Sequence, residues 1–113
     1  MEKTVLDELR RKFKDGAPVC SRIVETMGML STKIRFRIVC ALCKANLSVN
    51  DLISVLGTCK QSNISLQLKA LTDAGIVKSK RIANRKIYSI ADERLKLIVA
   101  FFERTYGPSK GKP

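Results

Sequence analysis

The spacing of apolar and polar residues predicts helices along most of this chain. In each helical segment the apolar side chains recur at intervals of three or four residues, which places them on one face. The predicted helices cover, in order, residues 5–13, 19–30, 34–42, 49–56, 60–75 and 93–106. Ser31 or Thr32, Ser48 and Asp92 stand where a helix-capping residue is favoured, and Gly57 can end the fourth helix.

The pattern changes between the last two predicted helices. Residues 76–82 and 85–90 are rich in β-branched side chains, which favour strands. Ala83 and Asn84 separate these segments and are suited to a tight turn. We therefore expect a mostly α-helical fold with one β-hairpin. A single domain should cover residues 1–106, with helices at its N-terminus, and a flexible tail should follow at 107–113.

Positive charge is concentrated in the fifth predicted helix and the hairpin after it. Residues 60–86 hold seven lysines and arginines and one acid, Asp73, so they supply half of the net charge of +12. Such a basic segment indicates a polyanionic partner, with nucleic acid as the first candidate and an anionic membrane surface as the second. The apolar content of 45% indicates a folded domain, and no apolar run is long enough to span a bilayer.

The fifth helix has two different faces when its residues are placed at intervals of roughly 100°. Ile64, Leu68 and Leu71 fall within a narrow arc and are expected to face the core. The N-terminal end carries short hydroxyl and amide side chains, which can reach base edges in a major groove, while free helix amides favour phosphate. From this helix, the residues expected to contact DNA are Lys60, Gln61, Ser62, Asn63, Ser65, Leu66 and Lys69.

Charged residues also surround the tip of the predicted hairpin. Arg81, Asn84, Arg85 and Lys86 are expected to follow a phosphate backbone or to enter a minor groove. A solvated helix face and an ordinary charged hairpin tip are the alternative interpretations of these two basic segments. Because one segment follows the other directly, a helix that reads DNA followed by a basic wing is favoured.

From about Thr32 to Tyr106 the chain resembles the ArsR/SmtB family of winged-helix repressors. The resemblance is carried by IRFRIVCALCKANLSVNDL, by QSNISLQLKALTDAGIVKSKR and by IYSI before the last helix. It implies a winged helix-turn-helix fold. It also implies a homodimer that binds an imperfect palindrome in double-stranded DNA until an inducer releases it.

Two features depart from the family pattern. Leu66 replaces the histidine, glutamine or arginine that is common at its position, and the turn at residues 57–60 is one residue longer than usual. The other positions that contact DNA in the family match Gln61, Ser62 and Ser65. The longer turn bears on the angle at which the helix would dock on DNA.

The last predicted helix carries an apolar stripe that is too broad for one partner. The family resemblance places the dimer contact on the first and last helices. The residues expected in this interface are Leu95, Ile98, Val99, Phe102 and Tyr106.

The metal sites of the family can be compared with this chain position by position. At the site on the last helix, Asp92 matches the family's aspartate, but other residues stand at the histidine positions. These are Arg94, Thr105 and Pro108. At the arsenic-type site, Ser48 and Asn50 replace the two cysteines. Because the chain has no histidine and lacks these cysteines, we predict no metal and no other cofactor.

The four cysteines, Cys20, Cys40, Cys43 and Cys59, leave three interpretations open. In the redox- and sulfur-sensing branch of the family, the HlyU, SqrR and BigR types, one cysteine lies where Cys40 lies. Its partner position here is Gly107, so Cys20 would have to take that part. Alternatively, Cys20, Cys40 and Cys43 bind a soft ion as a trithiolate. In the third interpretation the thiols are structural, since cysteine is among the most often buried residues.

These features together predict a sequence-specific DNA-binding regulator, a repressor, whose inducer the sequence does not reveal. The N-terminal segment has alternating charges and no apolar stretch, so we expect no secretory signal and a cytoplasmic location. The alternative is a winged-helix module that binds protein or RNA without operator specificity. An enzyme is not expected, since the chain lacks histidine, a nucleophile elbow, a glycine-rich phosphate loop and a cluster of carboxylates.

Overall fold

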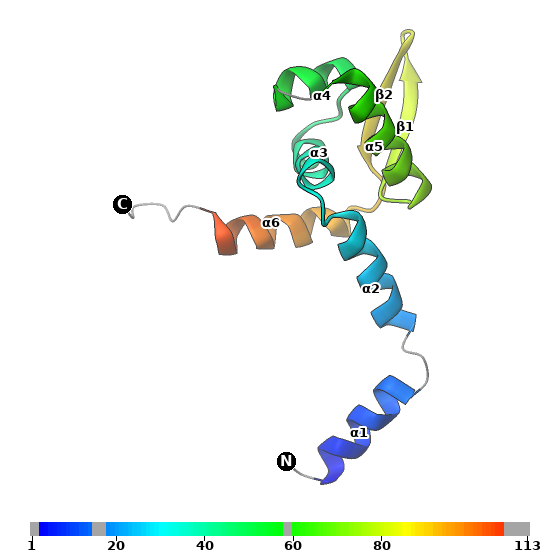
Figure 1. The fold of residues 1–113 in the computed structure, drawn as a ribbon, viewed down its shortest axis with the longest axis vertical. Helices are drawn as coiled ribbons and strands as arrows, with labels where there is room; N and C mark the ends of the chain where they lie inside the picture. The colour runs from blue at the N-terminus through cyan, green and yellow to red at the C-terminus, as the bar shows by residue number, and fades with distance from the viewer. Residues whose placement is uncertain (1–2, 15–17, 58–59, 108–113) are drawn as a thin grey trace, which may run out of the picture.

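Helices and one hairpin follow each other in the order that the sequence predicts (Figure 1). The structure is a computed structural model, which describes residues 3–14, 18–57 and 60–107 of the 113. The described elements are α1 (Lys3–Lys14), α2 (Pro18–Met29), α3 (Lys33–Lys44), α4 (Val49–Leu56), α5 (Gln61–Asp73), β1 (Val77–Ile82), β2 (Arg85–Ile90) and α6 (Arg94–Tyr106). Their boundaries differ from the predicted ones by less than one helical turn, so the predicted fold class is confirmed.

One apolar core lies between α3, α4, α5, the hairpin and the first half of α6. The predicted inner face of α5 is confirmed, because Ile64, Leu68 and Leu71 are all 0% exposed. Burying a side chain of this kind stabilises a protein by about 1.5–3 kcal/mol, so these three residues set the rotation of α5 about its axis. The other core residues are Ile38, Val39, Leu42, Leu52, Ile76, Val77, Tyr88, Ile90, Leu95 and Val99.

Local hydrogen bonds begin α3 and α4 at the predicted places. Thr32 rather than Ser31 caps α3, and its hydroxyl accepts a bond from the Arg35 amide at 3.3 Å. Ser48 and Asp51 form a reciprocal capping box at the start of α4. The Ser48 amide donates to the Asp51 carboxylate at 3.0 Å, and the Asp51 amide donates to the Ser48 hydroxyl at 3.1 Å. A cap of this kind contributes about 1 kcal/mol.

The start of α6 bears out the predicted capping by Asp92. Glu93, directly before Arg94, already has helical backbone angles of φ −59° and ψ −26° and makes no side-chain bond to the helix. The Asp92 carboxylate accepts a hydrogen bond from the Arg94 amide at 3.0 Å, which is the bond that a capping side chain makes. This two-residue reach is that of an Asx turn, which leads the chain from β2 into α6.

Strands β1 and β2 pair antiparallel, and Ile82 lies opposite Arg85 beside the turn. The turn residues Ala83 and Asn84 have φ angles of 49° and 67°. Positive φ at both central residues is what a two-residue type I′ turn requires, and this turn matches the twist of the flanking strands. The predicted hairpin and its turn are therefore confirmed.

A third segment joins the hairpin and was not predicted from the sequence. Leu47, between α3 and α4, exchanges two backbone hydrogen bonds with Tyr88 of β2, at 3.0 and 2.7 Å. This bridge fastens the base of the hairpin to the link between α3 and α4. The hairpin is therefore held to the core at a point well away from α5 in the sequence.

Helices α1 and α2 extend away from the core (Figure 1). The chain measures 59 × 41 × 21 Å and has a radius of gyration of 17.9 Å, whereas a compact domain of this length has a radius of about 13 Å. Large apolar side chains on both helices remain exposed. They are Val5, Leu6, Leu9, Phe13, Val19, Ile23, Val24 and Met27. Within one chain, the apolar faces of α1 and α2 are therefore left without packing partners.

Several predicted features lie outside the described residues. They are Cys59, the middle of the long turn at 57–60, and the tail beyond Gly107. Within the described part of the chain, no helix combines the length and the apolar character that crossing a membrane requires.

Helix α5 ends in a motif that depends on Gly75. The Gly75 amide donates to the Thr72 carbonyl at 3.0 Å, and the Ile76 amide donates to the Leu71 carbonyl at 2.9 Å. This pair of bonds is the Schellman motif, which needs a left-handed residue at the position of Gly75, whose φ is +77°. Because the Ile76 amide is used in this way, β1 begins at Val77 rather than at Ile76.

Replacing Gly75 by alanine should destabilise the protein. A residue other than glycine in the left-handed region costs about 1–2 kcal/mol, while no atom within 4 Å would clash with the added methyl group. Urea unfolding followed by circular dichroism measures the loss. Gly28→Ala is the matched control, because Gly28 also has open space around it but lies in α2 without a positive φ. Alanine there should stabilise by up to about 1 kcal/mol, and equal effects of the two substitutions would contradict the account of Gly75.

Candidate nucleic-acid interface

The N-terminal half of α5 is exposed along one edge. Gln61, Ser62, Asn63 and Ser65 are exposed, and beside them lies Leu66, a large apolar residue that is 64% exposed. The residue at the N-cap position, Lys60, makes no side-chain hydrogen bond to the helix. Its side chain therefore leaves the first amides of α5 open to an acceptor from outside, and these amides favour an anion.

Lys69 lies on the same helix and is exposed, but it is paired. Its ammonium lies 3.4 Å from the Asp73 carboxylate, one helical turn further on. Both side chains are well exposed, so the pair is worth little and exchanges readily. A phosphate can therefore replace Asp73 as the partner of Lys69.

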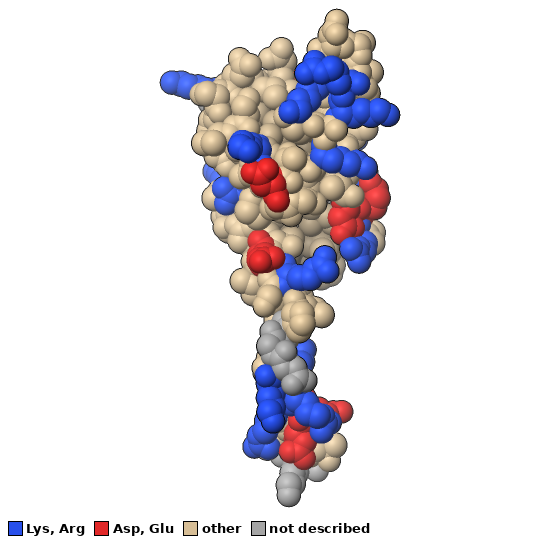
Figure 2. Space-filling model, turned by 90° about the vertical axis from the view of Figure 1, so that its right-hand side faces the viewer, with Lys and Arg blue, Asp and Glu red and all other residues tan. Residues whose placement is uncertain are grey.

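The hairpin carries a second group of basic side chains. On the face in Figure 2, lysine and arginine lie without acidic side chains on the upper part, where the hairpin lies, whereas basic and acidic side chains are mixed lower down. Arg81, Asn84 and Lys86 are exposed around the turn. Arg81 donates to the Asn84 carbonyl at 3.4 Å, and the Lys86 ammonium lies 5.6 Å from the centre of the Tyr88 ring. These weak contacts leave both charges available to a phosphate.

Arg85 is held differently from its neighbours. Its Nη2 donates to the Ser48 hydroxyl at 2.9 Å and to the Asp51 carboxylate at 3.2 Å. The bridge between Leu47 and Tyr88 makes this possible, since it brings the start of β2 beside the start of α4. The pKa of Asp51 is lowered from its usual value, first by hydrogen bonds with Ser48 and then by Arg85. Arg85 therefore joins the hairpin to α4, while its side chain stays 57% exposed; its predicted contact with DNA stays a prediction.

We call the exposed edge of α5 formed by Gln61, Ser62, Asn63 and Ser65 the reading edge. Two residues behind it, Arg35 and Gln67, were missed by the sequence reasoning. Arg35 of α3 donates to the Gln67 side chain at 3.2 Å, and Gln67 in turn donates to Asn63 at 3.1 Å. The spacing of Asn63 and Gln67 along one helix is visible in the sequence. The contact with Arg35 is not, because it depends on how α3 packs against α5.

The cysteines are distributed over two separate places in the described residues. Cys40 and Cys43 lie half-buried on α3, and Cys40 lines a shallow hollow with Glu103 of α6. Cys20 lies on α2 and borders a different hollow. Burial, and then the neighbouring Glu103 carboxylate, raise the pKa of the Cys40 thiol to about 11. The pKa of Cys43 is also raised, chiefly by burial.

The predicted trithiolate does not form within one chain. No group of three His, Cys, Asp or Glu side chains in the described part of the structure is arranged to hold a metal ion. The physical reason is that α2 extends away from α3, which separates Cys20 from the other two thiols (Figure 1).

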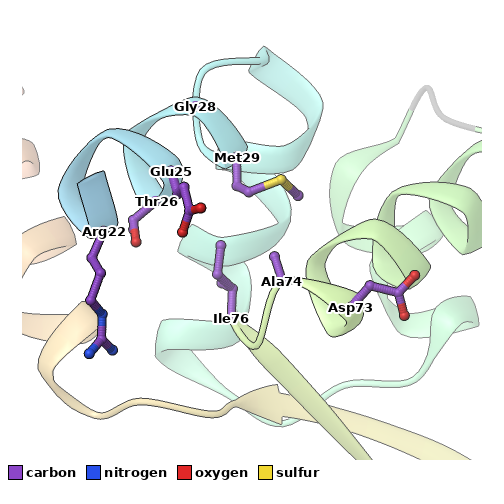
Figure 3. Close-up of a pocket in the computed structure, with 8 residues that line it drawn as sticks. All are labelled: Arg22, Glu25, Thr26, Gly28, Met29, Asp73, Ala74 and Ile76. Atoms are coloured by element: carbon purple, nitrogen blue, oxygen red, sulfur yellow. The ribbon is translucent and has the colours of Figure 1, made fainter. Parts of the chain in front are cut away.

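A further hollow separates α2 from the turn between α5 and β1 (Figure 3). Glu25, Thr26 and Met29 border it from α2, and Ala74 and Ile76 border it from the turn. Its charged residues are of both signs, as Arg22 and Asp73 also line it.

Comparison with known proteins agrees with this geometry. The family profile described as "Bacterial regulatory protein, arsR family" matches residues 32–79, which span α3 to the start of β1. Among solved structures, Rv0081 from M. tuberculosis is 32% identical, and the match covers 78% of this chain and 88% of that chain with a TM-score of 0.69. The chain belongs to the arsR family. Its members are transcriptional regulators rather than enzymes, and the resemblance inferred from the sequence is confirmed.

Other solved structures agree in fold with this arsR-family chain. HlyU from Vibrio cholerae N16961 is 25% identical, covering 80% of this chain and 98% of that chain, with a TM-score of 0.75. A homodimeric winged helix-turn-helix DNA-binding domain, Mb0332 from Mycobacterium bovis, is 22% identical over 80% of this chain and 82% of that chain, with a TM-score of 0.70. No curated protein sequence gives a significant match. The fold is therefore a winged helix-turn-helix.

The carboxylate of Asp92, which matches an aspartate of the family's metal site, is paired with Arg94. The two side chains form a two-pronged ion pair, with Arg94 Nη2 2.7 Å from Oδ2 of Asp92 and Nε 3.0 Å from Oδ1. Hydrogen bonds from Arg94 are the main cause that lowers the pKa of Asp92 to about 2. In this arsR-family chain, a guanidinium thus pairs with the carboxylate in the place where other members offer histidines.

The environment of Cys40 predicts slow and strongly pH-dependent alkylation. Only the thiolate reacts, so the rate should rise about tenfold per pH unit from pH 7 towards the pKa. Glu103→Gln removes a negative charge beside the sulfur and should lower this pKa, which raises the rate at pH 8. Mass spectrometry of the Cys40 peptide after timed iodoacetamide treatment measures it. Glu25→Gln, on α2, is the control and should change nothing; an unchanged rate in Glu103→Gln would refute the role of Glu103.

Proposed function

We propose that this protein is a sequence-specific regulator that binds a palindromic operator as a homodimer and represses transcription. The observation that carries the proposal is the exposed polar edge of α5 beside a basic hairpin, on a chain of the arsR family. The proposed DNA contacts are Lys60, Gln61, Ser62, Asn63, Ser65, Leu66, Lys69, Arg81, Asn84 and Lys86. Such a regulator would act on DNA in the cytoplasm.

Unpartnered apolar faces on α1, α2 and α6 support the homodimer. On α6 the predicted interface divides in two. Leu95 and Val99 are 5% and 1% exposed, so they already belong to the core of one chain. Ile98, Phe102 and Tyr106 are exposed, at 46%, 37% and 82%, and remain available to a second copy. The homodimeric Mb0332 domain has the same fold, which also supports this arrangement.

A dimer would present two α5 helices related by a two-fold axis. Recognition helices in such dimers enter major grooves about 34–36 Å apart, one helical turn of DNA, or a multiple of this distance. A palindromic operator is the sequence that matches this symmetry. The hairpin of each chain would then contact the DNA next to the α5 helix of the same chain.

We also propose that Cys40 is the thiol at which a release signal acts, with Cys43 and Cys20 as further thiols. Its raised pKa keeps Cys40 protonated near neutral pH, so oxidants that require a thiolate would react slowly in the conformation described here. Burial is the main cause of the raised pKa, and Glu103 beside Cys40 is the next, so α6 contributes to the control of this reactivity. Release of the protein from DNA would therefore require either a reagent that replaces the proton of the Cys40 thiol or a shift of α6.

A charge on the exposed face of α6 should break the dimer. Ile98→Glu and Phe102→Glu each place a carboxylate in the proposed apolar contact, where its burial without a partner is strongly unfavourable. Ala100→Glu is the matched control, because Ala100 is exposed on the same helix about 100° or more around from these residues. Sedimentation equilibrium should show monomers for the first two variants and dimers for the control. Dimers in all three would refute the α6 interface.

Operator binding should be steeply salt-dependent. If the dimer neutralises about 6–10 phosphates, the logarithm of the association constant should fall by about 6–10 for each tenfold rise in salt concentration. Arg81→Ala with Lys86→Ala should reduce the slope by about two per chain and weaken all sequences alike. Arg104→Ala, which removes the same kind of charge from α6, is the control and should leave the slope unchanged.

A genome-wide map of bound sites measures the sequence preference. Titration of the purified protein into duplexes at several salt concentrations measures the slope. No preference for any palindrome over random duplex would refute the proposal. Tight binding to RNA or to a protein under the same conditions would then favour a winged-helix module of another kind.

A further inference from the structure

We propose that Asn63 reads hydrogen-bond acceptors on DNA, because Arg35 and Gln67 fix which end of its amide faces outward. The inference rests on the proposed operator binding and deepens it. It gives Asn63 a role in specificity, and it makes Arg35 and Gln67 positioning residues. One series of side-chain hydrogen bonds runs from α3 through α5 and joins these residues.

Arg35 begins the series where three helices meet. Its Nε donates to the Met29 carbonyl at 2.6 Å, and its Nη2 donates to the Gly28 carbonyl at 3.5 Å. Both carbonyls belong to the last turn of α2, where the helix dipole favours a positive charge; the Gly28 carbonyl also accepts from the amide and the hydroxyl of Ser31. The half-buried guanidinium is therefore anchored from outside α5.

The guanidinium decides how the Gln67 amide is oriented. Arg35 Nη1 donates to Gln67 Oε1 at 3.2 Å. A guanidinium has donors only, so the amide of Gln67 cannot turn around without losing this bond. Its Nε2 therefore faces Asn63 and donates to Oδ1 at 3.1 Å. The direction of both amides follows from the donor-only chemistry of Arg35.

The group of Asn63 that remains is its Nδ2 nitrogen. Asn63 is exposed at the start of α5, and Nδ2 has no hydrogen-bond partner among the described residues. An amide nitrogen only donates. In a major groove it matches O6 and N7 of guanine, N7 of adenine or O4 of thymine, and it does not match the amino groups of adenine and cytosine.

Gln67→Glu reverses the direction of this series and so tests the proposal. The new carboxylate still accepts from Arg35, but it cannot donate to Asn63. The Asn63 amide should turn so that Nδ2 donates to the carboxylate and Oδ1 faces the DNA. Selection from a randomised duplex pool should then show the preference at one position in each half-site moving away from guanine and thymine, whose edges offer only acceptors, and toward cytosine, whose edge offers only a donor, by about tenfold to a hundredfold.

Asn63→Ala is the matched variant at the contact itself. It should remove the preference at that one position and leave the other positions unchanged, while the melting temperature stays close to that of the wild type. The proposal is overturned if Asn63→Ala keeps every wild-type preference, or if a folded Gln67→Glu variant does. A wild-type protein that selects no sequence would refute operator binding itself, which is a different result from either of these.

Discussion

The burial of one face of α5 is the constraint on which the rest of the structure depends. Ile64, Leu68 and Leu71 have no exposed surface and pack in the same core as residues from α3, the hairpin and α6. Turning the helix by one residue would rotate it by about 100°, bring polar side chains into the core and expose these three. The reading edge led by Gln61 and Ser62 therefore faces outward because of the core, and not because of any contact that it makes itself.

The hairpin is positioned by a different set of contacts. Its base is paired with Leu47 and its start is joined to the N-terminal cap of α4 through Arg85, so two separate contacts hold the hairpin beside α4. Helix α5 lies between them in the sequence and is joined to the hairpin by the motif at Gly75. The two basic surfaces thus have a fixed relation, which a protein needs if both are to meet one DNA duplex. Arg85 contributes to this relation as a tie rather than as a free charge.

The parts of the fold that the sequence predicts are those with local causes. The cap at Ser48, the turn at Ala83 and the inner face of α5 each depend on residues a few positions apart. The missed features join distant residues. Arg35 and Gln67 are 32 positions apart, and Arg85 and Ser48 are 37 apart. Periodicity shows which side of a helix faces inward, but it does not show which neighbour that side meets.

Helix α6 connects the two proposals that concern regulation. One side of it is in the core, through Leu95 and Val99, while Ile98 and Phe102 face outward and Glu103 lies beside Cys40. In the proposed dimer a shift of α6 would therefore alter both the contact between chains and the charge beside the thiol. Such a coupling acts in both directions, so a change at Cys40 that repels Glu103 would weaken the dimer by the same free energy by which dimer formation opposes that change. The same helix that completes the core would then also carry the response.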